Sequence, residues 1–366
     1  MSIVERVNAA VDAALGQRIV GCVILINKDG EEIYARAAGL ADREANVPMQ
    51  RDAIFRLASV TKPIVATAVL RLLDQGLIGL NDRVTRYLPW FTPANPDGSV
   101  ADIRIHHLLS HSSGLTYGNL PADASGGLSG IVNSLTETLQ NIAKVPLAFA
   151  PGTGWDYGTS IDVLGGVLAA INGSSVEDAI GRYVTGPLDM KDAHFYVTDP
   201  ARLATPYADG TPPVRMGEPH GIWDAAGTTV TTFSPARIFN LAAPQNGGAG
   251  MAGTADDVMK MLEVYNGRPG LLAPETVATA LANQIGNLPR REQDAGKRFG
   301  FIGAVLEDKQ AAKNPAPAGT VDWGGAWGHN WVVDPVNRMT IVVCTNTTFE
   351  GCNGPFRDDI LRAVYA

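Results

Sequence analysis

Hydrophobic and polar residues follow recognisable periods at both ends of the chain. Residues 1–16 place apolar side chains at helical spacing, which predicts an amphipathic helix. Two strand-forming runs, 19–27 and 31–39, flank the turn Lys28-Asp29-Gly30 and predict a β-hairpin. Near the other end, the pattern predicts three more strands and a closing helix, at 320–326, 328–334, 338–346 and 356–366. Strands at both ends with helices between them predict an α/β unit formed by both termini around an insertion.

The middle of the chain has a different pattern. Residues 106–115 predict a short helix ending at Gly114, and helical patterns follow at 135–146 and 161–173. Residues 118–130 are rich in Gly, Ser and Ala and predict a loop. Residues 205–250 are rich in Pro, Gly and Thr with weak periodicity, which predicts a long excursion over the surface.

The most apolar helical pattern begins near Ser59 and stops at Gly76. Between residues 64 and 73 only Thr67 and Arg71 are polar, so this helix is predicted to be buried. Pro63 fits only in a first helical turn, which places the helix start near Ser59.

Ser59 and Lys62 are three residues apart and therefore share a helix face. Burial lowers the pKa of a lysine, so Lys62 is predicted to act as a base on the serine hydroxyl. Free N–H groups at the helix start would stabilise negative charge. The ordinary alternative is that Ser59 caps the helix and Lys62 extends to the surface.

Composition and charge narrow the classes of function. The chain has 366 residues, 40 of them glycine, and a net charge of −8. Such an acidic chain lacks the clustered Lys and Arg residues that nucleic-acid binding needs. No apolar run is long enough to span a membrane, and the first residues do not resemble a signal peptide. The chain has only three cysteines, a small and odd number that is typical of a reducing compartment. A cytoplasmic location is expected.

Two further segments contain Tyr157 before a helix and Trp323-Gly324-Gly325 on a strand. With S-x-x-K near residue 60, this order resembles the superfamily of class C β-lactamases and penicillin-binding proteins. It is most similar to the family VIII carboxylesterases of the esterase B type. The matching segments are FRLASVTKPIVATAVLRLLDQG, IHHLLSHSSGL, PGTGWDYGTSIDVLGGV, GGAGMAGTADDV and WGGAWGHNWVVD, and they extend from about residue 20 to the end.

The resemblance implies an α+β, two-lobed fold of the serine β-lactamase and DD-peptidase type. An antiparallel sheet domain would comprise residues 1–85 and 230–366, with a mostly helical domain inserted at 86–229 and the active site in the cleft between them. Ser59 would be the nucleophile, and Lys62 and Tyr157 would carry its proton. The N–H groups of Ser59 and Ala326 would form the oxyanion hole. The substrate pocket would include Trp323, Gly324, Gly325, Tyr117, Trp155 and Trp327.

The sequence departs from the β-lactamase pattern at two positions. Trp323 stands where these enzymes usually have the Lys of Lys-Thr-Gly, and Thr159 stands where they have the Asn of Tyr-x-Asn. An anionic substrate would lose a charge-assisted hydrogen bond, whereas a neutral ester would lose nothing. A small-molecule, neutral carboxylic ester of short chain length is therefore the expected substrate, with no cofactor or metal. The alternatives are a β-lactamase, a D-amino-acid peptidase or an acyltransferase, and, from another class, a binding protein without catalysis.

Other patterns in the sequence have ordinary interpretations. Residues 248–253 match G-x-G-x-x-G, but no strand precedes them, so they predict a turn into a helix capped by Thr254. His107 and His111 lie four residues apart, and no third metal ligand is evident, so they are expected to cap and pack a helix. His329 is assigned no catalytic role.

Overall fold

The computed structural model describes residues 1–120, 127–130, 133–223, 229–290 and 294–366. Parts of the loop predicted at 118–130 and of the excursion predicted at 205–250 lie outside these residues. The helices are α1 (Ile3–Ala14), α2 (Thr61–Asp74), α3 (Ile105–Leu109), α4 (Leu135–Ala143), α5 (Ser160–Asn172), α6 (Val176–Ile180), α7 (Ala255–Leu262), α8 (Pro274–Leu281), α9 (Thr348–Cys352) and α10 (Pro355–Tyr365).

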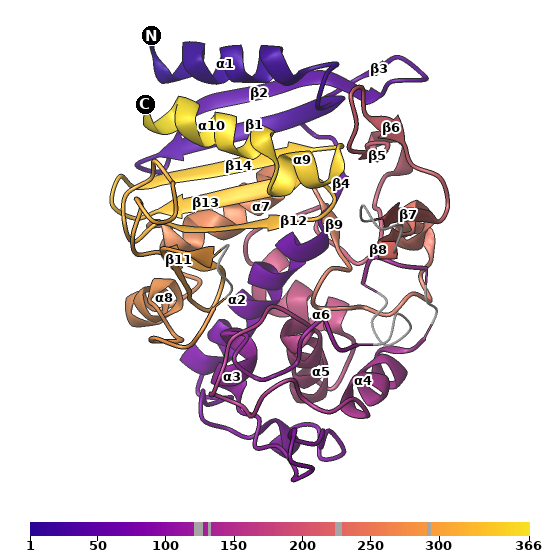
Figure 1. The fold of residues 1–366 in the computed structure, drawn as a ribbon, viewed down its shortest axis with the longest axis vertical. Helices are drawn as coiled ribbons and strands as arrows, with labels where there is room; N and C mark the ends of the chain where they lie inside the picture. The colour runs from indigo at the N-terminus through magenta and orange to yellow at the C-terminus, as the bar shows by residue number, and fades with distance from the viewer. Residues whose placement is uncertain (121–126, 131–132, 224–228, 291–293) are drawn as a thin grey trace.

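An eight-stranded sheet is built from the two ends of the chain, in the order β10-β11-β12-β13-β14-β1-β2-β3 (Figure 1). Its neighbouring strands are antiparallel throughout, as predicted. The strands are β1 (Gly21–Lys28), β2 (Glu31–Asp42), β3 (Val47–Pro48), β10 (Lys297–Phe299), β11 (Ala304–Leu306), β12 (Val321–Gly325), β13 (His329–Asp334) and β14 (Met339–Thr345). The predicted N-terminal hairpin is β1 and β2, and β14 lies beside β1 at the centre of the sheet.

Side chains of the central strands alternate between two apolar layers. In β1, Ile24 and Ile26 face a cluster formed with α1 and α10. Val23 and Leu25 face the opposite cluster, which includes α2, α5 and α7. A strand that is buried on both faces needs a continuous apolar run, which explains the composition of residues 19–27.

Helix α2 lies within the larger apolar cluster and is buried along nearly its whole length, as its sequence predicted. Helices α3 to α6 gather at the end of the molecule away from the sheet (Figure 1). The structure thus contains a sheet layer made by both chain ends and a helical region between them. The division of the chain at residues 85/86 and 229/230 stays a prediction.

Two predictions about the middle of the chain need correction. The helix expected at 106–115 ends at Leu109, because His111 adopts a left-handed backbone conformation with φ 57°. The excursion at 205–250 contains short paired strands: β5 (Tyr207–Ala208) with β6 (Val214–Arg215), and β7 (His220–Trp223) with β8 (Thr229–Phe233). A further short pair, β4 (Phe55–Arg56) and β9 (Ala252–Gly253), holds the segment before Ser59.

No helix among the described residues is long and apolar enough to cross a membrane.

Candidate active site

Ser59 lies in a single 3₁₀ turn, Ala58–Val60, directly before α2. The regular helix therefore begins two residues later than the sequence predicted. Ala58 has φ 46°, a left-handed conformation that is uncommon for a residue with a side chain and that occurs mainly where surrounding structure enforces it. Ser59 is partly exposed, although both of its neighbours are buried. The turn thus presents the hydroxyl group at the edge of the core.

Lys62 is buried, and its ammonium group lies beside the Ser59 hydroxyl. The Nζ to Oγ distance is 3.3 Å, and Nζ also donates to the Tyr117 hydroxyl at 3.1 Å and to the Gly248 carbonyl at 2.6 Å. The N-cap of α2 is Val60, without a side-chain capping bond. Both parts of the ordinary alternative, a capping serine and a surface lysine, are therefore wrong.

The pKa of Lys62 is raised, which corrects the prediction of a lysine deprotonated by burial. Burial by itself does lower the pKa, but neighbouring groups that favour the charged form outweigh it: Tyr117, Tyr157 and Asp162. Lys62 is thus an ammonium ion at neutral pH. It brings a positive charge to Ser59 and, in this protonated form, has no lone pair with which to accept the serine proton.

Asp162 is an acidic residue of the site that the sequence did not reveal. It lies near the start of α5 and is buried, which raises its carboxyl pKa, while Lys62 and the Gly248 N–H oppose that rise. The Gly248 N–H donates to Asp162 Oδ1 at 3.1 Å, and the carbonyl of the same residue accepts from Lys62. A Cβ at position 248 would lie 2.4 Å from Asp162 Oδ2, so a larger residue there would displace the carboxyl group.

Tyr157 is enclosed by aromatic rings and lies over Lys62. Its ring centroid is 4.8 Å from that of His111, 4.9 Å from that of Trp323 and 4.6 Å from Lys62 Nζ. The indole Nε1–H of Trp323 donates to the Tyr157 hydroxyl at 3.0 Å. Trp323 therefore occupies a lone pair of that oxygen and leaves the hydroxyl proton for another acceptor.

Strand β12 lies against the turn that contains Ser59. A Cβ on Gly325 would lie 2.4 Å from the Leu57 carbonyl oxygen and 3.5 Å from Ala58 Cβ. The nearest neighbours of Gly324 lie outside this turn: a Cβ there would lie 2.8 Å from Cys352 Sγ. Ala326 follows the strand in a turn closed by a hydrogen bond from Gly328 N–H to the Gly325 carbonyl, and it packs in one cluster with Ala58.

The remaining predicted pocket residues differ in exposure. Tyr117 directs its hydroxyl to Lys62 while 41% of the residue is exposed. Trp155 is 5% exposed and packs in one cluster with Phe299, Tyr157 and Trp323. Trp327 is 6% exposed and packs edge-on against Phe233 in the cluster that includes Ala58. Trp155 and Trp327 are therefore buried in packing clusters, whereas Tyr117 has exposed surface.

The three histidines singled out by the sequence have structural contacts. His107 Nδ1 accepts the Arg104 N–H at 3.2 Å and caps α3. His329 Nε2 is 2.7 Å from the Arg56 carbonyl and joins β13 to the segment before Ser59. The His111 ring packs at a tilt against Tyr157, and burial together with Lys62 lowers the pKa of His111 well below the usual value. Among the described residues, no group of His, Cys, Asp and Glu could hold a metal ion.

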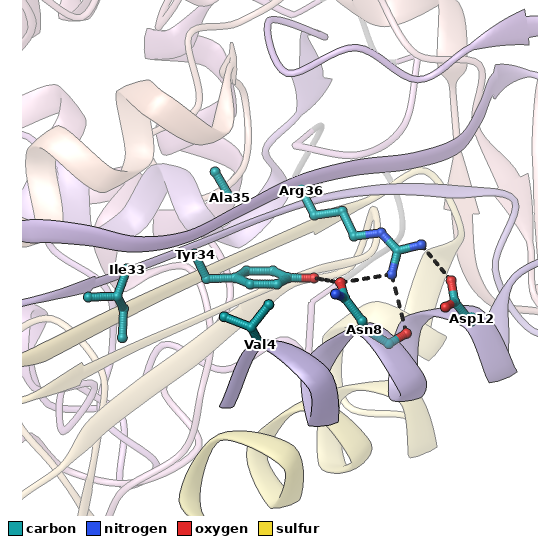
Figure 2. Close-up of a pocket in the computed structure, with 7 residues that line it drawn as sticks. All are labelled: Val4, Asn8, Asp12, Ile33, Tyr34, Ala35 and Arg36. Carbon is teal, nitrogen blue, oxygen red and sulfur yellow. Dashed lines mark hydrogen bonds and ion pairs between the residues drawn. The ribbon is translucent and has the colours of Figure 1, made fainter. Parts of the chain in front are cut away.

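A pocket of about 530 Å³ lies between α1 and β2, on the face of the sheet away from Ser59 (Figure 2). Its polar groups pair with one another: Tyr34 donates to Asn8 at 2.9 Å, and Arg36 pairs with Asp12 at 2.5 Å. It therefore offers no nucleophile or acid–base pair, and the cluster at Ser59 is the candidate active site.

Comparison with known proteins identifies the family of the chain. The beta-lactamase family model matches residues 7–365. The chain belongs to the beta-lactamase family. It is 44% identical to "Esterase EstB" of Burkholderia gladioli, in a match that covers all of this chain and 96% of that protein. Its fold is similar to that of "EstCE1, a hydrolase with promiscuous acyltransferase activity", with a TM-score of 0.91, 39% identity and coverage of 99% and 98% of the two chains.

More distant members of the family differ in their named activities. "Acyltransferase calJ" of Penicillium decumbens is 28% identical, with 85% of this chain and 80% of that protein covered. The antiparallel sheet with flanking helices and the α+β class expected from the sequence are those of the beta-lactamase fold.

Proposed function

We propose that the protein is a serine carboxylesterase that hydrolyses small, neutral carboxylic esters through an acyl-enzyme on Ser59. The observation that carries the proposal is the position of Ser59 Oγ, 3.3 Å from the buried Lys62 ammonium, within the aromatic enclosure that holds Tyr157. The likeness to Esterase EstB over the full chain supports the same reaction class.

In the acylation step, Ser59 Oγ attacks the ester carbonyl and the bond to the leaving oxygen breaks. The positive charge of Lys62 stabilises the negative charge that develops on Oγ as the serine loses its proton. Tyr157 gives its hydroxyl proton to the leaving alcohol and receives the serine proton in exchange, so the net transfer is from Ser59 to the alcohol. Water then attacks the acyl-enzyme by the reverse route and releases the acid.

The oxyanion hole is proposed to comprise the N–H groups of Ser59 and Ala326. The close approach of Gly325 to Leu57 and Ala58 supports it, because this contact holds the end of β12 beside the turn of the nucleophile. Two N–H groups from separate elements suit the negative oxygen of a tetrahedral intermediate.

The preference for neutral esters follows from the groups at the open side of the site. Trp323 offers an indole N–H that is already used by Tyr157, so it cannot replace a lysine that binds a substrate carboxylate. A second candidate function is transfer of the acyl group to an alcohol instead of water. It is favoured by the likeness to EstCE1, whose title names acyltransferase activity.

Labelling and turnover together test the proposal. A fluorophosphonate is expected to label Ser59, as located by mass spectrometry, and Ser59→Ala should abolish both labelling and turnover. Hydrolysis of p-nitrophenyl butyrate should be faster than that of a chromogenic cephalosporin. Adding a short alcohol and measuring the new ester gives the share of acyl transfer. Label on another residue would refute the mechanism, and faster cephalosporin turnover would refute the substrate preference.

A further inference from the structure

His111 contacts the residues on both sides of Tyr157 as well as Tyr157 itself. Its carbonyl accepts the Asp156 N–H at 3.3 Å, and its Nδ1 accepts the Gly158 N–H at 3.4 Å. Its ring packs on the Tyr157 ring at 4.8 Å. One residue therefore fixes the backbone before and after the tyrosine and one face of the phenol.

The position of His111 is itself tightly determined. The residue is 2% exposed and has φ 57°, and its ring meets Phe299 edge-on at 5.3 Å. Gly158 is held from another side as well, because a Cβ there would lie 2.0 Å from the Leu115 carbonyl oxygen. A left-handed conformation at a bulky residue costs free energy and persists only where surrounding contacts enforce it.

The bond to Gly158 requires a particular form of the imidazole. Nδ1 can accept an N–H only when it carries no proton, so the ring must be neutral with its proton on Nε2. The charged group that acts on His111 is Lys62, and its positive charge together with burial disfavours a second proton on the ring. The cation that serves Ser59 thus also keeps His111 in the form that holds Tyr157.

We infer that His111 is a positioning residue for the proposed esterase reaction, and that it aims the Tyr157 hydroxyl at the leaving oxygen through its Nδ1 bond to Gly158. The inference rests on the proposed function, because it concerns the proton that Tyr157 gives to the leaving alcohol. It predicts that loss of the bond impairs poor leaving groups, which need that proton, more than good ones.

The test compares two esters of one acid in variants of His111. Methyl butyrate releases methanol and needs a proton, whereas p-nitrophenyl butyrate releases a stable phenolate. His111→Phe keeps a ring but loses the acceptor, and kcat for methyl butyrate should fall at least tenfold further than kcat for p-nitrophenyl butyrate, with KM little changed. His111→Asn retains an acceptor oxygen near Nδ1 and tolerates a left-handed backbone, so it should recover most of that difference.

His107→Phe is the matched control, because His107 Nδ1 also accepts a backbone N–H, outside the site. It should lower the melting temperature without changing the ratio of the two kcat values. Equal losses on both esters in His111→Phe, or no recovery in His111→Asn, would overturn the inference. If His111→Phe does not fold, the ratio in His111→Asn decides: a ratio within threefold of wild type supports the inference, and a larger change refutes it. A wild-type protein that cleaves neither ester would instead refute the proposed function.

Discussion

Replacing Gly325 by alanine tests whether contact between β12 and the turn that contains Ser59 sets the reaction rate. The added Cβ would lie 2.4 Å from the Leu57 carbonyl oxygen, whereas ordinary contacts begin at 3.4 Å. The strand and the turn must therefore separate by about 1 Å. A displacement of that size in an active site can lower the rate about 100-fold, equivalent to about 2.7 kcal/mol of transition-state stabilisation.

The assay is kcat/KM for p-nitrophenyl butyrate, corrected for the folded fraction by active-site titration with a fluorophosphonate. Gly324→Ala is the first control, because its Cβ strains the same strand against Cys352 and His329 and not against the Ser59 turn. Gly181→Ala is the second, since Gly181 has helical φ and ψ and open space around its Cβ position. Two results would show that the contact does not control catalysis. One is a kcat/KM of Gly325→Ala within threefold of the wild-type value, and the other is a kcat/KM of Gly325→Ala no lower than that of Gly324→Ala.

Three further substitutions have defined outcomes. Asp162→Asn removes a negative charge that raises the pKa of Lys62, so the loss of kcat/KM at alkaline pH should move to lower pH; an unchanged pH profile would exclude this influence. Trp323→Phe removes the donor to Tyr157, and kcat for methyl butyrate should fall about 2–10-fold, the range for one hydrogen bond; an unaltered kcat would show that the bond is idle. Burial lowers the pKa of His329 from 6.5 to about 4, so the unfolded chain binds this proton first as pH falls. Wild type should lose about 3 kcal/mol of stability between pH 7 and 4 from this group, and urea unfolding of His329→Gln should show a correspondingly weaker pH dependence.

The elements that could be predicted are those that local patterns define. The buried helix α2 was evident from its apolar run, and the N-terminal hairpin from the Asp-Gly turn between two strand-forming segments. The predicted cap of α7 by Thr254 is confirmed, with Asp257 completing the capping box. The S-x-x-K spacing also placed Ser59 and Lys62 together correctly, because neighbours three residues apart stay close in a helical turn.

The parts that could not be predicted depend on distant segments. The Gly248 carbonyl that binds Lys62 belongs to the backbone, so no residue type announces it. Asp162 looked like a polar residue near a helix start, and only the fold makes it a buried neighbour of a cation. The direction of the Lys62 pKa shift follows from groups 55 or more residues away, which no local pattern contains. The two-residue strands of the 205–250 region are too short to show an alternating pattern.

The central pairing of β1 with β14 has a consequence for biosynthesis. Residues 21–28 can pair with β2 early, but they acquire their second partner only after residues 339–345 leave the ribosome, and β12 reaches the Ser59 turn only when residues 321–325 have been made. Contacts this distant in sequence form late and slowly. Ser59 and Lys62 are thus translated early but stay without the proposed oxyanion strand for most of synthesis. A nascent chain would therefore be hydrolytically silent until nearly all of it has been translated.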